Sequence, residues 1–146
     1  MRNQLYKILV AVLLGLLLIL IVCSNNVELT CSYEVTRSKC HHGDTVSVSV
    51  TVTNSGRNFK FVGAAVDHFS QADLTLNGDV NGHSFSSIDT GTVTTDDTEY
   101  IFRRGSSKSY VYQFVIPDNA RTGSYDLSFW VFGKQIILND VIYVDE

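Results

Sequence analysis

Regular alternation of apolar and polar residues dominates the chain after its N-terminal segment. The clearest example is residues 45–53, which read T-V-S-V-S-V-T-V-T and place valines on one face and hydroxyl side chains on the other. A period of two is typical of a strand in a sheet with one buried and one solvated face, as antiparallel sheets have. The turn-forming residues Asn54-Ser55-Gly56 follow directly. The pattern predicts a half-buried strand that ends in a turn.

Further short apolar runs recur along the chain, with turn-forming residues between them. We expect strands at Val27–Thr36, Phe59–Val66, Ala72–Leu76, Ser84–Ile88, Thr98–Arg103, Tyr110–Ile116, Tyr125–Val131, and Ile136–Leu138 continuing after a break at Asn139-Asp140 into Val141–Val144. No stretch of this part shows a sustained helical period. About seven to nine short strands separated by turn signals predict an all-β sandwich or barrel.

An uncharged apolar segment, Ile8 to Cys23, precedes the strands and follows two basic residues, Arg2 and Lys7. Basic residues before such a segment keep that end in the cytoplasm and direct the following chain across the membrane. Three interpretations are open: a cleaved signal peptide, an uncleaved signal-anchor that crosses the membrane as a helix, and a lipoprotein signal processed at Cys23. Each divides the chain into a targeting segment (residues 1–24) and one extracytoplasmic domain (residues 25–146), either membrane-anchored or secreted.

Composition and charge restrict the partners of this domain. Hydrophobic residues form 45% of the chain and charged residues 18%, which provides enough apolar material for one core. Two of the 11 basic residues precede the apolar segment, so the exported part has 9 basic and 15 acidic residues and a net charge of −6. An acidic domain without a basic stripe is a poor partner for nucleic acid. We expect a protein or glycan partner at the cell surface, and no cofactor.

Two cysteines, Cys31 and Cys40, follow the apolar segment. Such a pair in an oxidising compartment predicts a disulfide. Free thiols would instead allow a zinc or copper site. Adjacent residues on a strand point to opposite faces, which disfavours that site. Its candidate ligands are Cys40, His41, His42 and Asp44, with His68 and His83 elsewhere in the chain.

Several of these segments resemble bacterial and archaeal immunoglobulin-like surface domains of the CARDB and NEW3 types. Gly43-Asp44-Thr45 and the valine strand after it are similar to the second strand of those domains, and the stretch from Ala120 to Leu127 to their penultimate strands. The resemblance covers Cys40 to Val144, apart from a central stretch, Asp67 to Tyr100. It implies an immunoglobulin-like antiparallel β-sandwich that serves in surface structure, adhesion or the presentation of other modules, and that has no catalytic residues.

Two loop motifs raise other functions. Asn77, Asp79 and Asn81 place oxygen side chains at alternate positions of a calcium loop, but Ile88 stands where its closing glutamate belongs. Two successive turns explain the same residues. Asp89-Thr90-Gly91 is similar to the active-site loop of retroviral-type aspartic proteases, whose aspartate shares a proton with a second subunit. No glycine-rich flap sequence accompanies it, so we expect a turn here and no enzyme.

Aromatic residues near the end of the chain offer a third possibility. Trp130 and Phe132, with Tyr110 and Tyr112, would form an exposed platform for stacking on sugars. Core packing is the more usual role for the lone tryptophan of an immunoglobulin-like domain, and it is the role we expect. The sequence therefore predicts a non-catalytic extracytoplasmic binding or structural module of the cell surface or envelope. A carbohydrate- or calcium-binding sandwich is the alternative.

Overall fold

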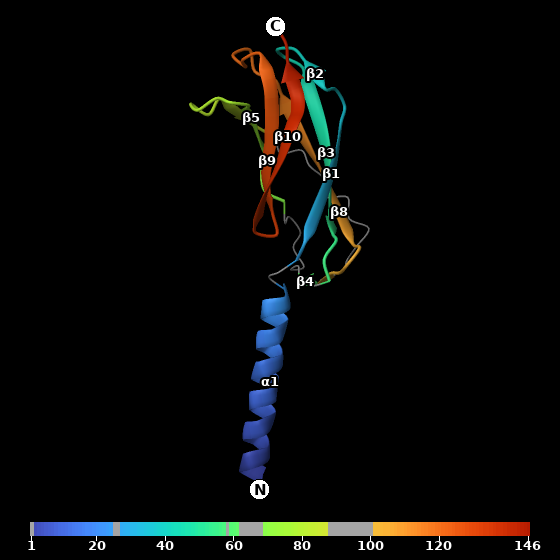
Figure 1. Cartoon of the computed structure of the whole chain (residues 1–146), viewed down its shortest axis with the longest axis vertical. Coiled ribbons are helices and arrows are strands. Elements are labelled where there is room, and N and C mark those ends of the chain that lie inside the picture. The colour runs from blue at the N-terminus through green and yellow to red at the C-terminus, as the bar shows by residue number, and fades with distance from the viewer. Residues whose placement is uncertain (1, 25–26, 58, 62–68, 88–100) are drawn as a thin grey trace. The chain divides into compact units, whose positions relative to one another are not determined.

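The computed structural model describes residues 2–24, 27–57, 59–61, 69–87 and 101–146 (Figure 1). They fall into two compact units that are each built from several segments of the chain. The first unit comprises Met1–Thr30, Thr53–Ala64 and Thr98–Ser107, and the second comprises Cys31–Val52, Ala65–Asp97 and Lys108–Glu146.

The first unit contains the helix α1 (Arg2–Ser24), whose leucine and isoleucine side chains between Leu5 and Leu20 are exposed. Among the described residues, no helix combines the length and the apolar character that crossing a membrane requires. The signal-anchor and transmembrane-helix predictions for Ile8 to Cys23 are therefore wrong. The physical reason is that this apolar segment is shorter than the ~20 residues that a span usually needs.

A small cluster of backbone and side-chain hydrogen bonds connects the other segments of the first unit. The two-residue strands β4 (Lys60–Phe61) and β7 (Ile101–Phe102) pair antiparallel. The buried amide of Asn54 donates to the Phe102 carbonyl at 3.0 Å and accepts from the Gly56 N–H at 3.1 Å. Because a buried amide is costly without partners, these bonds fix the turn after the valine strand.

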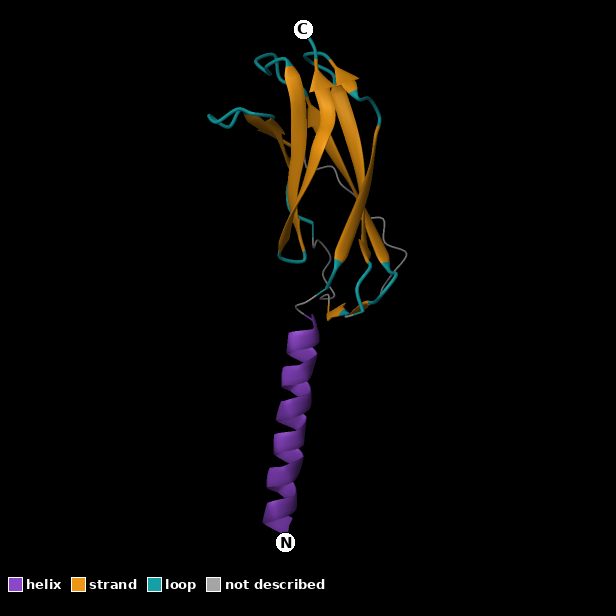
Figure 2. Ribbon diagram, in the orientation of Figure 1, coloured by secondary structure: helices purple, strands orange, loops and turns teal. Residues whose placement is uncertain are grey.

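Two sheets build the second unit, and their long strands lie roughly along one common axis, with arrowheads at both ends (Figure 2). The three-stranded sheet has the order β1-β3-β8, and the five-stranded sheet the order β2-β10-β9-β5-β6. The strands are β1 (Leu29–Val35), β2 (Lys39–Cys40), β3 (Thr45–Asn54), β5 (Asp73–Leu76), β6 (Ser84–Ser86), β8 (Ser107–Val115), β9 (Gly123–Val131) and β10 (Lys134–Val144).

The core of the second unit lies between these sheets. Every valine of β3 is fully buried while its hydroxyl residues face outward, which confirms the predicted half-buried strand. Aromatic rings of the two layers meet in the core. The Tyr112 and Phe129 ring centroids lie 5.4 Å apart, and those of Phe85 and Phe114 6.3 Å apart. Burial of these large rings is the main source of stability for a unit of this size.

The predicted immunoglobulin-like antiparallel β-sandwich is wrong, because the five-stranded sheet is mixed. The short strand β2 pairs parallel with the end of β10, so that Lys39 lies opposite Tyr143 and Cys40 opposite Val144. The Tyr143 N–H donates to the Ser38 carbonyl, and the Asp145 N–H to the Cys40 carbonyl, both at 2.8 Å. A strand of two residues is too short to show a period in the sequence, so its pairing could not be predicted.

The last strand also differs from the prediction. A break was expected at Asn139-Asp140, but β10 continues through it as one strand with a bulge between Leu138 and Ile142. Asp140 has a φ of 52°. The turn-forming residues therefore bend the strand instead of ending it.

Candidate functional site

The outer face of the five-stranded sheet carries the largest exposed aromatic side chain of the second unit. Tyr125, Leu127, Phe129 and Val131 of β9 are buried, so the residues between them point outward. Trp130 is one of these and is 52% exposed. The core role expected for Trp130 is wrong. Alternate residues of a strand point to opposite faces, and the buried face of β9 is formed by the other set of residues.

The register of the sheet places polar residues in rows around Trp130. Gln135 of β10 lies directly opposite Trp130, and Ser70 lies on its other side, donating its N–H to the Trp130 carbonyl. The next row contains Ile137, Ser128, Asp73 and Ser86, and a third contains Asp126, Thr75 and Ser84. We call this surface, formed by the residues of the three rows, the Trp130 face.

Two carboxylates lie on the Trp130 face. The Ser86 hydroxyl donates to Asp73 Oδ1 at 2.8 Å, and the Asp140 N–H donates to Asp126 Oδ1 at 2.8 Å. The ion pairs among the described residues lie elsewhere and involve neither of these carboxylates. Both groups therefore keep accepting capacity for a ligand that donates hydrogen bonds.

The hairpin turn after β9 fixes the position of Trp130. Phe132 and Gly133 connect β9 to β10 with φ values of 51° and 77°, as in the turns that best match strand twist. A positive φ is unusual for a phenylalanine, whose side chain is 6% exposed here. Phe132 thus packs inward, and Tyr110 and Tyr112 are also buried, while Trp130 points outward, so the four predicted platform residues do not share a surface.

A loop between β5 and β6 contains the predicted calcium ligands. The Asp79 carboxylate accepts the Asn81 N–H at 2.8 Å, contacts the His83 ring, and lies 3.5 Å from the Arg121 guanidinium. The N–H of Asn81 and the basic side chains beside Asp79 hold the pKa of its carboxyl below the usual value. A carboxylate already in contact with basic groups is a poor ligand for calcium, so this geometry does not support the prediction.

Asn77 lies apart from this carboxylate. It donates from Nδ2 to Asp140 Oδ1 at 2.8 Å, which ties the loop to the β10 bulge. Among the described residues, no cluster of histidine, cysteine and carboxylate side chains is arranged to hold a metal ion.

Cys31 and Cys40 are separate thiols, so the predicted disulfide is wrong. Cys31 lies on β1 in the three-stranded sheet and Cys40 on β2 in the five-stranded sheet, whereas sequence spacing alone suggested proximity. Burial raises the pKa of Cys31 to about 11 and also raises that of Cys40. Cys31 is half-buried and Cys40 buried, and protonated thiols of this kind are poor nucleophiles and poor metal ligands.

The remaining predicted metal ligands serve the turn before β3. The Asp44 carboxylate accepts the His41 N–H at 2.8 Å and pairs with Arg37 at 2.8 Å, and these bonds lower its pKa. The His42 ring lies 2.9 Å from the Ala120 carbonyl. His41 and His42 therefore make separate contacts, although they lie in a turn and not on a strand as the sequence argument assumed. His68 and Asp89-Thr90-Gly91 lie outside the described residues.

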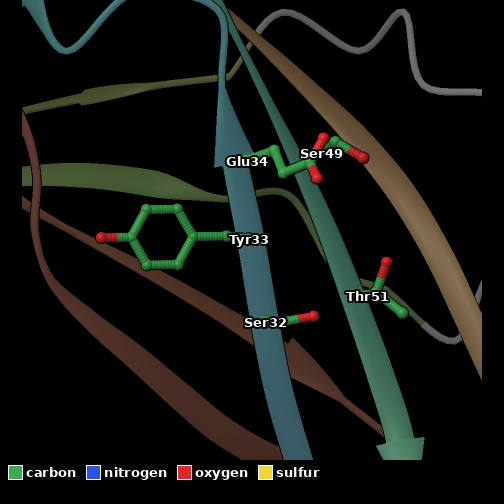
Figure 3. Close-up of a pocket in the computed structure, with 5 residues that line it drawn as sticks. All are labelled: Ser32, Tyr33, Glu34, Ser49 and Thr51. Carbon is green, nitrogen blue, oxygen red and sulfur yellow. The ribbon is translucent and has the colours of Figure 1, made fainter.

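A hollow of about 220 Å³ lies on the outer side of the three-stranded sheet and was not predicted. Its lining residues are Ser32, Tyr33, Glu34, Ser49 and Thr51. Figure 3 shows Ser32 and Glu34 pointing toward β3, and the Tyr33 ring on the opposite side of β1. The Thr51 hydroxyl is 2.8 Å from that of Ser109. The hollow provides hydroxyls and one carboxylate, that of Glu34.

Comparisons with known proteins give neither a family nor a function. No family model and no curated protein matches the sequence. Among solved structures, the alkylpurine DNA glycosylase AlkC of Pseudomonas fluorescens bound to abasic-site DNA is similar at 12% identity and a TM-score of 0.49, over 83% of this chain and 31% of that one. The sporulation control protein Spo0M of Bacillus subtilis is similar at 12% identity and a TM-score of 0.43, over 81% and 49%.

A third structure, AvmM, which catalyses macrocyclization in alchivemycin A biosynthesis, gives 12% identity and a TM-score of 0.42, over 82% of this chain and 85% of that one. This chain thus spans about a third of the length of the glycosylase and about half of Spo0M. The resemblance to CARDB and NEW3 domains stays a prediction.

Proposed function

We propose that this chain is a non-catalytic extracytoplasmic binding module of the cell surface or envelope, and that it binds its partner on the Trp130 face. The observation that carries the proposal is the half-exposed ring of Trp130, near the hairpin end of β9, the central strand of the five-stranded sheet. A large apolar ring left in water represents binding free energy that only a ligand can recover.

Hydrogen bonds hold the backbone of Trp130 on both sides. The Trp130 N–H donates to the Ser70 hydroxyl at 2.7 Å, and the Trp130 carbonyl accepts the Ser70 N–H at 2.8 Å. On the other edge, Gln135 continues the antiparallel register with β10. A backbone already ordered on paired strands needs no further ordering when a ligand binds, which favours affinity.

The residues available for chemistry support a non-catalytic role. The half-buried Cys31 and the buried Cys40 have raised pKa values, and within the described part of the chain the His83 ring contacts the carboxylate of Asp79. Export is supported by Arg2 and Lys7 ahead of the apolar part of α1, an arrangement typical of secretory signals.

The test uses the purified protein immobilised on beads and cell-envelope material separated into a protein fraction and a glycan fraction. We expect one fraction to be retained by the native protein and lost with Trp130→Ala. Val115→Ala is the matched control, because Val115 is exposed on the other sheet. Retention that is equal for all three proteins, or absent for the native protein with both fractions, would contradict the proposed binding surface.

A further inference from the structure

We infer that the ligand of the Trp130 face is a neutral oligosaccharide that stacks one ring on Trp130 and places a second over Asp73 and Ser86. This inference rests on the proposed function and names the ligand of that surface. It follows from the composition of the face, the spacing of its residues and its charge.

The composition of the Trp130 face is unlike that of a protein–protein contact. Around Trp130 lie an amide, several hydroxyls and two carboxylates, namely Gln135, Ser128, Thr75, Ser84, Ser86, Asp73 and Asp126. Protein interfaces are enriched in further aromatic and arginine side chains at their centre and depleted in serine and aspartate. A single ring amid small polar side chains suits a ligand with one apolar face and a rim of hydroxyls, which describes a sugar ring.

The spacing fits a ligand longer than one sugar. Asp73 lies directly opposite Ser128, two residues along β9 from Trp130. Two residues along a strand and one strand across separate Trp130 from Asp73 by about 8 Å. One ring stacked on Trp130 places its rim hydroxyls near Gln135 and Ser128. A second ring in the same chain then lies over Asp73 and Ser86.

The charge of the face selects neutral sugars. Asp73 accepts one hydrogen bond from Ser86, and Asp126 one from a backbone N–H, and neither takes part in an ion pair among the described residues. A carboxylate oxygen is a strong acceptor for a hydroxyl, and such charge-assisted bonds are about twice as strong as neutral ones. The same negative charges repel a uronic acid or a sulfated sugar.

Ile137 extends the apolar part of the site. It is 57% exposed and lies opposite Ser128, diagonally next to Trp130. Diagonal neighbours on a sheet are within reach of a large side chain. The C–H face of the stacked sugar therefore contacts Ile137 as well as the ring.

The experiment uses the intrinsic fluorescence of the full chain, which contains one tryptophan, so its emission reports on this site alone. Neutral oligomers of glucose, mannose and N-acetylglucosamine are titrated against it, with oligogalacturonate as the acidic counterpart. We expect a saturable change in emission with at least one neutral oligomer and none with oligogalacturonate.

Three variants test the assignment of residues, with calorimetry as the readout common to all. Trp130→Ala abolishes binding. Asp73→Ala weakens it by about tenfold or more, since a hydrogen bond to a charged group is lost. Asp73→Asn keeps a hydrogen-bond acceptor but removes the charge. It should therefore reduce the difference in affinity between the neutral oligomers and oligogalacturonate. Val115→Ala, on the other sheet, leaves affinity unchanged.

The outcomes separate this inference from the proposed function. If no neutral oligomer binds but an envelope protein is retained in a Trp130-dependent way, the sugar assignment is wrong and the binding surface stands. If sugars bind equally to native protein and Trp130→Ala, the site is wrong. Equal binding of neutral and acidic oligomers by native protein contradicts the role given to Asp73.

Discussion

The turn between β9 and β10 shows how single residues position the Trp130 face. Gly133 has a φ of 77°, and an added methyl group at this position would meet no atom within 4 Å. Its role is therefore conformational, because residues with a side chain disfavour this left-handed region. Phe132 adopts the same region, and its burial offsets the strain.

We predict that Gly133→Ala lowers the free energy of unfolding by about 1–2 kcal/mol, the cost of a left-handed conformation for a residue with a side chain. Chemical denaturation measures this change. Gln135→Ala, a neighbouring exposed substitution, is the control and changes stability by less than about 0.5 kcal/mol. A loss no larger than that of the control would mean that the turn does not require a positive φ here.

Cys31 gives a prediction about pH. Its pKa rises from 9.0 to about 11 in the folded chain because burial disfavours the thiolate. The folded state therefore resists ionisation that the unfolded state permits. Stability is fully present below pH 9 and falls as pH rises towards 11. We expect the unfolding free energy to decrease over that interval, and Cys31→Ser to remove part of the decrease.

The thiol state is checked on the same samples. Titration of thiols in denaturant gives the same count with and without prior reduction, because Cys31 and Cys40 are unpaired. An increase in the count after reduction would show a disulfide and would also change the pH dependence expected for Cys31.

At the scale of elements, the bulge of β10 is held by side chains from other segments. Asp140, with a φ of 52°, donates its N–H to Asp126 and accepts a hydrogen bond from Asn77. The bulge thus joins β9, β10 and the loop after β5. Aspartate and asparagine tolerate this backbone conformation better than other residues with side chains.

We expect Asp140→Ala to lower stability by about 1–2 kcal/mol, because it removes both the acceptor for Asn77 and the tolerance of a positive φ. Asp140→Asn keeps both and changes stability by less than about 0.5 kcal/mol. Thermal denaturation distinguishes the two variants. If Asp140→Asn lowered stability as much as Asp140→Ala, the charge of Asp140 and not the backbone geometry would be what stabilises the bulge.

The parallel pairing of β2 with β10 gives a second prediction for elements. The amides of Tyr143 and Asp145 donate to the Ser38 and Cys40 carbonyls, so they should exchange slowly with solvent. Nuclear Overhauser contacts between Lys39 and Tyr143 should accompany this protection. Fast exchange at both amides would contradict the parallel pairing and would indicate a purely antiparallel sheet.

The sequence predicted those elements whose periodicity is long enough to be seen. The valines of β3 and the alternating residues of β8 and β9 are buried as expected, because each strand has one core-facing side. Strand β2 and the pairing of its two residues depend on contacts distant in the sequence. The core position predicted for Trp130 was wrong. Periodicity shows which residues of a strand share a face, but it does not show whether the second face is covered by other parts of the chain.

At the scale of the whole molecule, the proposed export would determine which partners the domain meets. We predict that cell fractionation finds residues 25–146 outside the cytoplasmic membrane, because basic residues precede the apolar part of α1. Replacing Arg2 and Lys7 by glutamate should reduce export, whereas Lys39→Glu with Lys108→Glu, a matched change of charge after the segment, should not. Recovery of the native chain in the cytoplasm alone would contradict the proposed location.

The unequal lengths of the outermost strands affect how copies of this chain assemble. In the described part, β2 and β6, at the sides of the five-stranded sheet, have two and three residues, whereas β1 and β8 have seven and nine. A short side offers few unpaired backbone groups to another chain, and a long side offers many. If copies of this chain joined by strand pairing, addition at the long strand β1 would therefore be favoured over addition at β2 or β6. An array of these modules joined in that way would leave every tryptophan ring open to solvent, so that weak single contacts could add up to avid binding of a polymer.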